Sequence, residues 1–305
     1  MKSLIAYFTV MIISFLVNGT DSRNSSGPDQ DQTPLFSFGV IADAQYCDCE
    51  PSGTRFYKSS LEKLGEAFGA FEEEKVEFVV NLGDLIDREF DSFNTLTDVL
   101  KGNSIKLYNV AGNHDFSVDE RQKKHVLPLL TGKTGYYSFS HGSFRFIILD
   151  GNEVSTYGPG SRQQVKEAVT MIEKLREEGE PNGMDWNGGI GSKQIEWLKD
   201  QLNNSIRENQ KVFILCHFPV WPVNEHNLLN YRQIIEIMQP YDNIIAWFSG
   251  HNHAGNYGNL NMVHFYNFKG MVETPDQNSF AIVDVYPNKI WIRGSGRERS
   301  MILAY

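Results

Sequence analysis

The chain has 305 residues, of which 41% are hydrophobic, enough to bury the core of one large domain or two small ones. Its net charge is -10, and it contains no basic run. Proteins that bind long nucleic acids usually carry a basic face, so this balance argues against a DNA or RNA polymer as partner. The acidic balance does not exclude small anions as ligands, because bound metal ions can supply positive charge locally.

The N-terminus has the pattern of an export signal. Residues 4–17 form an apolar run that is short for a membrane span and has the length of a signal-peptide core. We expect residues 1–22 to be removed on secretion or export to a periplasm, with no stable membrane insertion afterwards; a retained N-terminal anchor is the alternative. Residues 23–34 are polar and typical of a flexible linker. We expect residues 35–305 to form a single domain.

The first third of this domain alternates strand-like and helix-like segments. Apolar runs at 35–42, 78–82 and 107–111 predict buried strands. Helical periodicity between them predicts helices at 59–71 and 93–100. This order favours parallel strands joined by crossover helices.

The rest of the chain mixes helices with further strands. Residues 135–141 and 144–150 flank a Gly-Ser turn and predict a hairpin. Helical periodicity covers 161–178 and 192–206, with Ser192 as the expected N-cap of the second helix. Further apolar runs predict strands at 211–216, 244–248, 262–268, 279–285 and 290–293. The order fits a mixed sandwich of two sheets covered by helices.

The spacing of the three cysteines favours neither a disulfide nor a zinc site. Cys47 and Cys49 are separated by one residue, so a bridge between them would close a small strained ring, which disfavours it. Zinc binding by this pair is also disfavoured, because no second Cys pair completes a tetrahedral set. Cys216 ends an apolar run and is expected to be a small buried residue.

Five short polar patches each follow an apolar run, and we expect their loops to gather at one edge of a sheet. Such an arrangement can hold two divalent metals, which usually serve phosphate ester or anhydride chemistry. Carboxylate, amide oxygen and imidazole together suit Mn, Fe or Zn better than Ca or Mg. The candidate ligands are Asp43, Gln45, Asp84, Asn113, His217, His251 and His253.

Local features of these patches suit a crowded centre. Asp43 and Gln45 are two apart, so in extended backbone they face the same way. Gly83 lets the backbone approach closely, and the Asp84 carboxylate that follows it can bridge two cations about 3.5–4 Å apart.

Each patch alone has an ordinary structural explanation. An Asp after a strand is often a helix N-cap, Gly-Asp is common turn chemistry, and a lone His217 is more often a core or surface histidine. Asp87 and Asp115 lie close by, and we expect them to orient a ligand or cap a helix. Five such patches in this order favour a shared metal site over coincidence.

The ordered set resembles the calcineurin-like metallophosphoesterase superfamily, whose signature runs D-x-H, G-D-x-x-[DN], G-N-H-[DE], a lone His and G-H-x-H. The segments here are D-A-Q, G-D-L-I-D, G-N-H-D, C-H-F-P and G-H-N-H. The resemblance implies a four-layer α/β/β/α sandwich with a two-metal site where the loops converge. By position, it assigns one metal to Asp43, Gln45, Asp84 and His253, the other to Asp84, Asn113, His217 and His251, and catalysis to His114.

Gln45 stands where most of the superfamily has His. An amide oxygen is a harder, weaker ligand than imidazole, so we expect Mn to be favoured over Zn. D-x-Q and the surrounding F-S-F-G-V-I-A-D-A-Q-Y are similar to the manganese-dependent ADP-ribose/CDP-alcohol diphosphatase group. This similarity implies hydrolysis of phosphoanhydride bonds in small nucleoside diphosphate derivatives by a hydroxide that bridges the metals. His114 would stabilise developing negative charge or protonate the leaving oxygen.

Base recognition needs an aromatic platform, and several aromatic residues lie beside the motifs. They are candidates for stacking, with loop packing as the alternative: Tyr46, Phe116, Trp221 and Tyr257. Two other functions stay open, namely a phosphodiesterase or phosphomonoesterase with the same metals, and a binding scaffold without catalysis. The missing Tyr in G-D-L-I-D-R-E argues against a purple acid phosphatase, and the intact His114 argues against a scaffold.

Overall fold

A computed structural model of the chain describes residues 32–100, 104–132 and 134–305. The expected signal segment and most of the expected linker lie outside the described residues. None of the helices in the described ranges combines the length and apolar composition that a membrane crossing needs.

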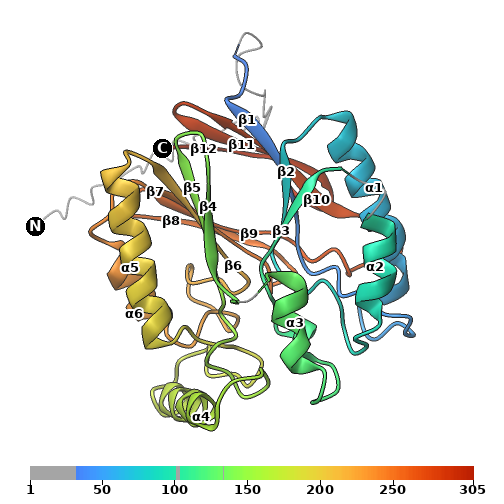
Figure 1. Cartoon of the computed structure of the whole chain (residues 1–305), viewed down its shortest axis with the longest axis vertical. Coiled ribbons are helices and arrows are strands. Elements are labelled where there is room, and N and C mark those ends of the chain that lie inside the picture. Colours follow the sequence, from blue (N-terminus) through green and yellow to red (C-terminus); the bar gives the residue numbers. More distant parts are fainter. Residues whose placement is uncertain (1–31, 101–103, 133) are drawn as a thin grey trace, which may run out of the picture.

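Two mixed sheets pack face to face at the centre of the molecule (Figure 1). The first has the order β12-β11-β10-β1-β2-β3, in which β1, β2 and β3 run parallel and the others pair antiparallel. Its strands are β1 (Phe36–Ile41), β2 (Phe78–Asn81), β3 (Lys106–Asn109), β10 (Ser279–Tyr286), β11 (Lys289–Gly296) and β12 (Met301–Ala304).

The second sheet has the order β4-β5-β6-β7-β9-β8. Its inner strands β5, β6, β7 and β9 run parallel, and β4 and β8 are antiparallel edges. Its strands are β4 (Tyr137–His141), β5 (Phe144–Leu149), β6 (Lys211–Cys216), β7 (Ile244–Ser249), β8 (Asn256–Leu260) and β9 (Val263–Asn267).

Aromatic rings from both sheets fill the layer between them. Phe146 and Phe213 stack with centroids 4.8 Å apart, and Phe38 of the first sheet meets the Phe146 ring edge-on at 5.5 Å. All three side chains are fully buried, and each such burial contributes about 1.5–3 kcal/mol. This packing holds the two sheets, and hence their loops, in one fixed relation.

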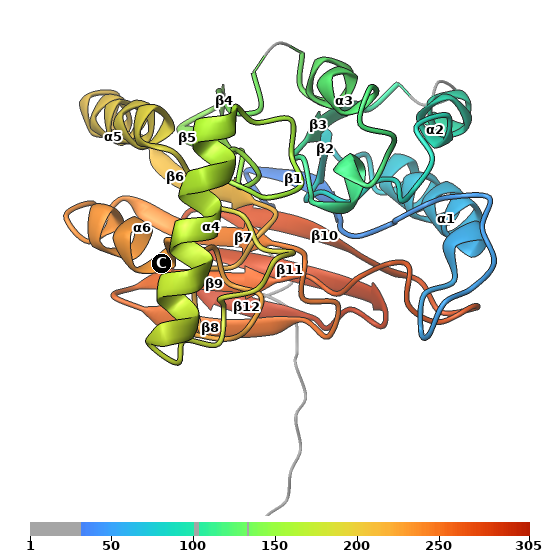
Figure 2. The ribbon, with the colours of Figure 1, turned by 90° about the horizontal axis from the view of Figure 1, so that it is seen from below.

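Helices cover the two outer faces. In Figure 1, α1 and α2 lie on one side of the sheets, and α5 and α6 lie on the other. Figure 2 shows α4 crossing the end of the sandwich. The helices are α1 (Ser60–Glu73), α2 (Ser92–Leu100), α3 (Lys123–Leu130), α4 (Arg162–Glu177), α5 (Ser192–Arg207) and α6 (Tyr231–Met238), with short 3-10 turns η1 (Tyr57–Ser59) and η2 (His114–Phe116). This is the four-layer α/β/β/α sandwich that the sequence predicted.

The apolar faces explain how the helices dock. Leu64, Phe68 and Phe71 of α1 pack on the first sheet in one buried cluster. Gly39 of β1 makes room for this contact, because a Cβ there would lie 2.8 Å from the Phe71 ring. On the other side, α5 buries Ile195 and its neighbours against the second sheet in the same way.

The predicted helices and strands are all present with small shifts at their ends, whereas α3, α6, β8 and β12 were not predicted. The prediction of Ser192 as an N-cap is wrong, because α5 begins at Ser192 and its cap is Gly191. The physical reason is that the backbone of Gly191 is extended (φ -77°, ψ 163°), whereas Ser192 already lies within the helix. A Cβ at Gly191 would lie 3.0 Å from the Glu153 carboxyl group, which accepts a hydrogen bond from the Gly191 backbone N–H.

The cysteines differ from expectation at one point. Cys47 and Cys49 form a disulfide, although their spacing disfavoured it. Burial beside Tyr57 and Val272 fixes the Cys47 side chain in the turn that follows β1. Cys216 is a buried free thiol as predicted, and burial raises the pKa of its thiol to about 12.

Candidate metal centre

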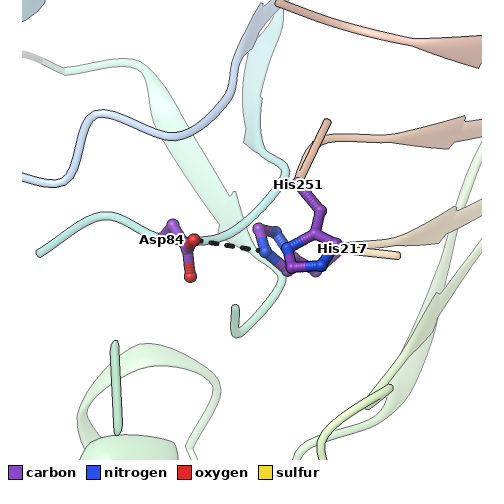
Figure 3. Close-up of side chains that lie close together, drawn as sticks. All are labelled: Asp84, His217 and His251. Atoms are coloured by element: carbon purple, nitrogen blue, oxygen red, sulfur yellow. Dashed lines mark ion pairs between the residues drawn. The ribbon is translucent and has the colours of Figure 1, made fainter. Parts of the chain in front are cut away.

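The polar patches meet where the parallel strands of both sheets end. Asp84 follows β2, His217 follows β6 and His251 follows β7, and each of these side chains is buried. Figure 3 shows the Asp84 carboxylate facing the His217 ring, with His251 beside it. The Asp84 Oδ2 and His217 Nε2 atoms are 3.3 Å apart, and Asn113 Oδ1 lies 3.1 Å from the same His217 nitrogen.

A second group of ligand-type atoms adjoins the other side of Asp84. Gln45 Nε2 lies 3.1 Å from Asp84 Oδ2 and 3.2 Å from His253 Nε2. His253 Nε2 is in turn 3.5 Å from Asp43 Oδ1. Asp84 therefore stands between two clusters, the place that a bridging carboxylate would occupy.

These residues fit a pair of divalent ions. Asp84, His217 and His251 each offer a ligand atom, and the three atoms lie within 4.8 Å of one another. The Gln45 Oε1 atom is buried without a hydrogen-bond partner. Rotation of the amide group can present this oxygen to an ion held with Asp84 and His253.

The backbone around the centre is strained. Asp43, Gln45, Asp84 and His251 all have positive φ angles, 51°, 45°, 53° and 69°, which non-glycine residues rarely adopt. Such strain persists where the surrounding structure over-determines it, often at functional sites. Gly83 is required here, because a Cβ would lie 2.5 Å from the His217 ring.

Neighbouring groups fix the orientation of the imidazoles. His217 Nδ1 donates to the Leu82 carbonyl at 2.9 Å, which leaves the Nε2 lone pair toward Asp84 and Asn113. His253 Nδ1 donates to the Glu273 carboxylate at 2.7 Å, with the same effect. Asp115 accepts hydrogen bonds from the backbone N–H groups of Asp84, Leu85, Ile86 and Gly112, as expected of a structural carboxylate.

The buried carboxylates of the centre require positive charge close to them. Burial alone would raise the pKa of Asp84, but the His217 and His114 charges outweigh it and hold the pKa well below its usual range. Burial opposes protonation of His217 and His253, yet the carboxylates of Asp84 and Asp43 raise their pKa values to about 9. Without metal ions, protons on these two imidazoles supply the positive charge that the carboxylates require.

His114 lies at the edge of this centre. Its backbone N–H donates to Asp84 Oδ1 at 2.7 Å, and its Nδ1 lies 3.0 Å from Asp87 Oδ1. Its Nε2 faces an open cavity of about 340 Å³, 3.3 Å from the Arg55 guanidinium. The cavity is lined by Gln45, Arg55, Asp84, Asn113, His114, Trp186, His226, His251 and His253.

The calcineurin-like phosphoesterase family matches residues 36–255 of the chain. The chain belongs to this family. A relative from Arabidopsis thaliana is 30% identical over 311 residues, covering 88% of this chain and 96% of the relative. A human relative is 29% identical over 334 residues, covering 93% and 97%. Both are named manganese-dependent ADP-ribose/CDP-alcohol diphosphatase.

Solved structures agree on the fold. A dimetal phosphatase from Danio rerio superposes with a TM-score of 0.79 at 24% identity, covering 90% of this chain and 100% of its own. A purple acid phosphatase from yellow lupin gives a TM-score of 0.58 at 14% identity, over 90% and 54% of the two chains. As a calcineurin-like phosphoesterase, the chain is a metal-dependent phosphoric ester hydrolase, as the sequence predicted.

The aromatic residues proposed for stacking do not line the cavity of this phosphoesterase. Tyr46 and Phe116 are buried in the apolar cluster that the first sheet forms with helices α1 and α2. Tyr257 lies on β8 with its ring stacked on His264, and Trp221 lies against Gly258 of the same strand. The aromatic side chain on the cavity is Trp186, which is 45% exposed.

Several residues at the site belong to none of the five polar patches. Trp186 and Asn187 come from the Gly- and Asn-rich loop before α5, and Asn187 Oδ1 lies 2.9 Å from His251 Nε2. Arg55, His226 and Glu273 belong to no ligand-type spacing. Only the folded chain brings these five residues to the metal centre.

Proposed function

We propose that the chain hydrolyses the phosphoanhydride bond of nucleoside diphosphate derivatives, of the ADP-ribose or CDP-alcohol type, with two divalent manganese ions. The observation that carries this proposal is the placement of Gln45 between Asp84 and His253, where it contributes an amide in place of the usual imidazole. Relatives of almost the same length that bear the diphosphatase name support the same reaction.

We assign one ion to Asp43, Gln45, Asp84 and His253, and the other to Asp84, Asn113, His217 and His251. When bound, two such ions lower the pKa of a water molecule and neutralise phosphate oxygens. The protein contributes buried, oriented ligands: Glu273 and the Leu82 carbonyl hold the rings of His253 and His217 in place.

The reaction breaks the P–O bond to the bridging oxygen and transfers a proton to the leaving oxygen. A water oxygen bonds to one phosphorus and releases one proton to solvent. The bond from that phosphorus to the bridging oxygen breaks, and its electron pair leaves with the second phosphate. Once the substrate replaces Arg55 NH1 as the neighbour of Nε2, His114 can carry a proton there and donate it to the leaving oxygen, with the Asp87 carboxylate 3.0 Å from Nδ1. The products are two phosphate monoesters.

A panel of substrates tests the reaction. The purified chain, loaded with Mn or with Mg, is given ADP-ribose, CDP-choline, a cyclic nucleotide and p-nitrophenyl phosphate. We expect Mn-dependent release of a nucleoside monophosphate from the two diphosphates at the highest kcat/KM. A higher kcat/KM for the cyclic nucleotide or the monoester would identify a phosphodiesterase or phosphomonoesterase with the same metals instead.

We also propose that the chain is exported, with residues 1–22 as signal and residues 35–305 as the working domain. The apolar run at 4–17 supports this proposal, and so does the Cys47–Cys49 disulfide, because disulfides persist in oxidising compartments. N-terminal sequencing of the protein recovered from its native host tests it. A sequence that starts at Met1 in a membrane fraction would point to a retained anchor.

A further inference from the structure

Arg55 is a cation on the cavity wall without an anionic partner. Its guanidinium lines the cavity and its NH1 group lies 3.3 Å from His114 Nε2. Among the described residues, no carboxylate forms an ion pair with it, whereas Arg145 and Arg293 pair with acidic side chains. A half-buried guanidinium that faces a cavity without a carboxylate is suited to an anionic ligand.

The segment that carries Arg55 is fixed on both sides. Arg55 exchanges backbone hydrogen bonds with Ser52 at 3.1 Å, and it forms a β-bridge with Glu273. Lys63 Nζ in turn donates to the carbonyl of Glu273 at 3.0 Å. The Cys47–Cys49 disulfide lies a few residues before this turn. The backbone that carries Arg55 is therefore fixed before any substrate arrives, which lowers the entropic cost of using its guanidinium.

We propose that Arg55 is a specificity-determining residue that binds the second, unattacked phosphate of a diphosphate substrate. This inference rests on the proposed function. His114 is assigned to the bridging oxygen, and the next group along a diphosphate is the second phosphate. A guanidinium 3.3 Å from His114 Nε2 is placed to reach the non-bridging oxygens of that phosphate.

The charge change of the reaction makes this contact selective. When the bridging P–O bond breaks, its electron pair moves onto the second phosphate before the leaving oxygen has taken the proton from His114. The forked guanidinium then faces more negative charge than in the ground state, so it stabilises the transition state more than bound substrate. A phosphodiester with an alcohol leaving group has no phosphate at this place and gains nothing from Arg55.

A binding experiment tests this role of Arg55 separately from catalysis. The probes are the methylene-bridged analogue of ADP-ribose, which is not hydrolysed, and AMP, each titrated calorimetrically into the Mn-loaded full-length chain. We expect Arg55→Gln to weaken binding of the analogue about 10- to 100-fold and binding of AMP less than about threefold. Arg55→Lys should restore part of the loss, because it keeps the charge but not the fork. Arg207→Gln, on an exposed arginine of α5, is the matched control.

Equal weakening of both probes, or no weakening by Arg55→Gln, would overturn the proposal. Turnover gives the second readout: the kcat/KM of Arg55→Gln should fall for ADP-ribose by at least the binding loss and stay within about threefold for thymidine 5′-p-nitrophenyl phosphate. If the wild-type chain cleaves no diphosphate, the proposed function fails. The binding comparison still decides the role of Arg55, and an unchanged melting temperature of the variants excludes misfolding.

Discussion

The cavity has a floor and a rim that are built differently. The floor consists of the metal-ligand candidates, of which Gln45, Asp84, Asn113, His251 and His253 line the cavity, while Asp43 and His217 are fully buried. The rim consists of Arg55, Trp186 and His226. Floor side chains are almost all buried, hydrogen-bonded to one another and partly held on strained backbone. Rim side chains are half-buried or exposed and come from loops. We infer that the floor fixes the chemistry and the rim chooses the substrate.

The largest expected effect on activity is at His114, which lines the cavity together with floor and rim residues. His114→Ala should lower kcat by about 10²- to 10⁴-fold, the range for a positioned acid, because the leaving oxygen loses its proton donor. Metal content should not change, since His114 is not among the assigned ligands. Steady-state kinetics and metal analysis check this, with the exposed His125→Ala on α3 as control. Full kcat in His114→Ala would make this histidine a structural residue.

A residue that orients one of the metal-ligand candidates should affect the affinity for metal. Glu273→Ala removes the carboxylate that accepts from His253 Nδ1, and we expect metal affinity to fall about 10- to 100-fold. Glu273→Gln keeps an acceptor oxygen and should lose less. Titration with Mn measures both, and Glu236→Ala on the exposed face of α6 is the control. Wild-type Mn affinity in Glu273→Ala would show that this contact does not orient the ring for an ion.

A change confined to the rim should act on substrate binding. Trp186→Ala removes the aromatic surface of the cavity, and base stacking of this kind contributes about 1–3 kcal/mol, so we expect KM for ADP-ribose to rise about tenfold with kcat retained. Trp186→Phe should keep most of the affinity. Trp291→Ala on β11 serves as control. A loss of kcat without a change in KM would contradict the division between floor and rim.

Within the floor, Gln45 should set the preference among metals. Gln45→His replaces an amide oxygen with an imidazole, a softer ligand, and should shift the Mn/Zn activity ratio toward Zn. Activity assays of the metal-free protein reloaded with each ion measure the ratio. An unchanged ratio would mean that Gln45 does not bind either ion.

The smallest expected effect is a pH dependence of stability. In the metal-free chain, the pKa values of His217 and His253 are raised to about 9, above the value of about 6.5 in an unfolded chain. Their contribution to stability is therefore complete below pH 6.5 and is lost as the pH rises toward 9. Because ions compete with these protons, the gain in melting temperature from Mn should grow over the same interval. Thermal melts with EDTA or Mn at pH 6.5 and 9 check this, and a constant gain would contradict it.

The sequence by itself determined the layers of the fold and the residue types of the floor. Apolar runs define β1, β2, β6 and β7, and a candidate ligand follows each run. Parallel pairing brings the ends of β1 and β2 together in one sheet and those of β6 and β7 in the other, and the packing of the two sheets joins the two pairs. The weaker elements α3, α6, β8 and β12 were missed because they are short, with four to eight residues each, so tertiary packing decides them.

Only the tertiary structure decided the rim and the groups that support the floor. Glu273 reaches His253 across 20 residues, and Arg55 reaches His114 across 59, without a motif that links either pair. Phe116 stands beside a ligand motif, yet it turns into the core, while Trp186 faces the cavity. The physical reason is that the direction of a loop side chain follows from burial and backbone contacts with distant segments, and local residue spacing does not contain that information.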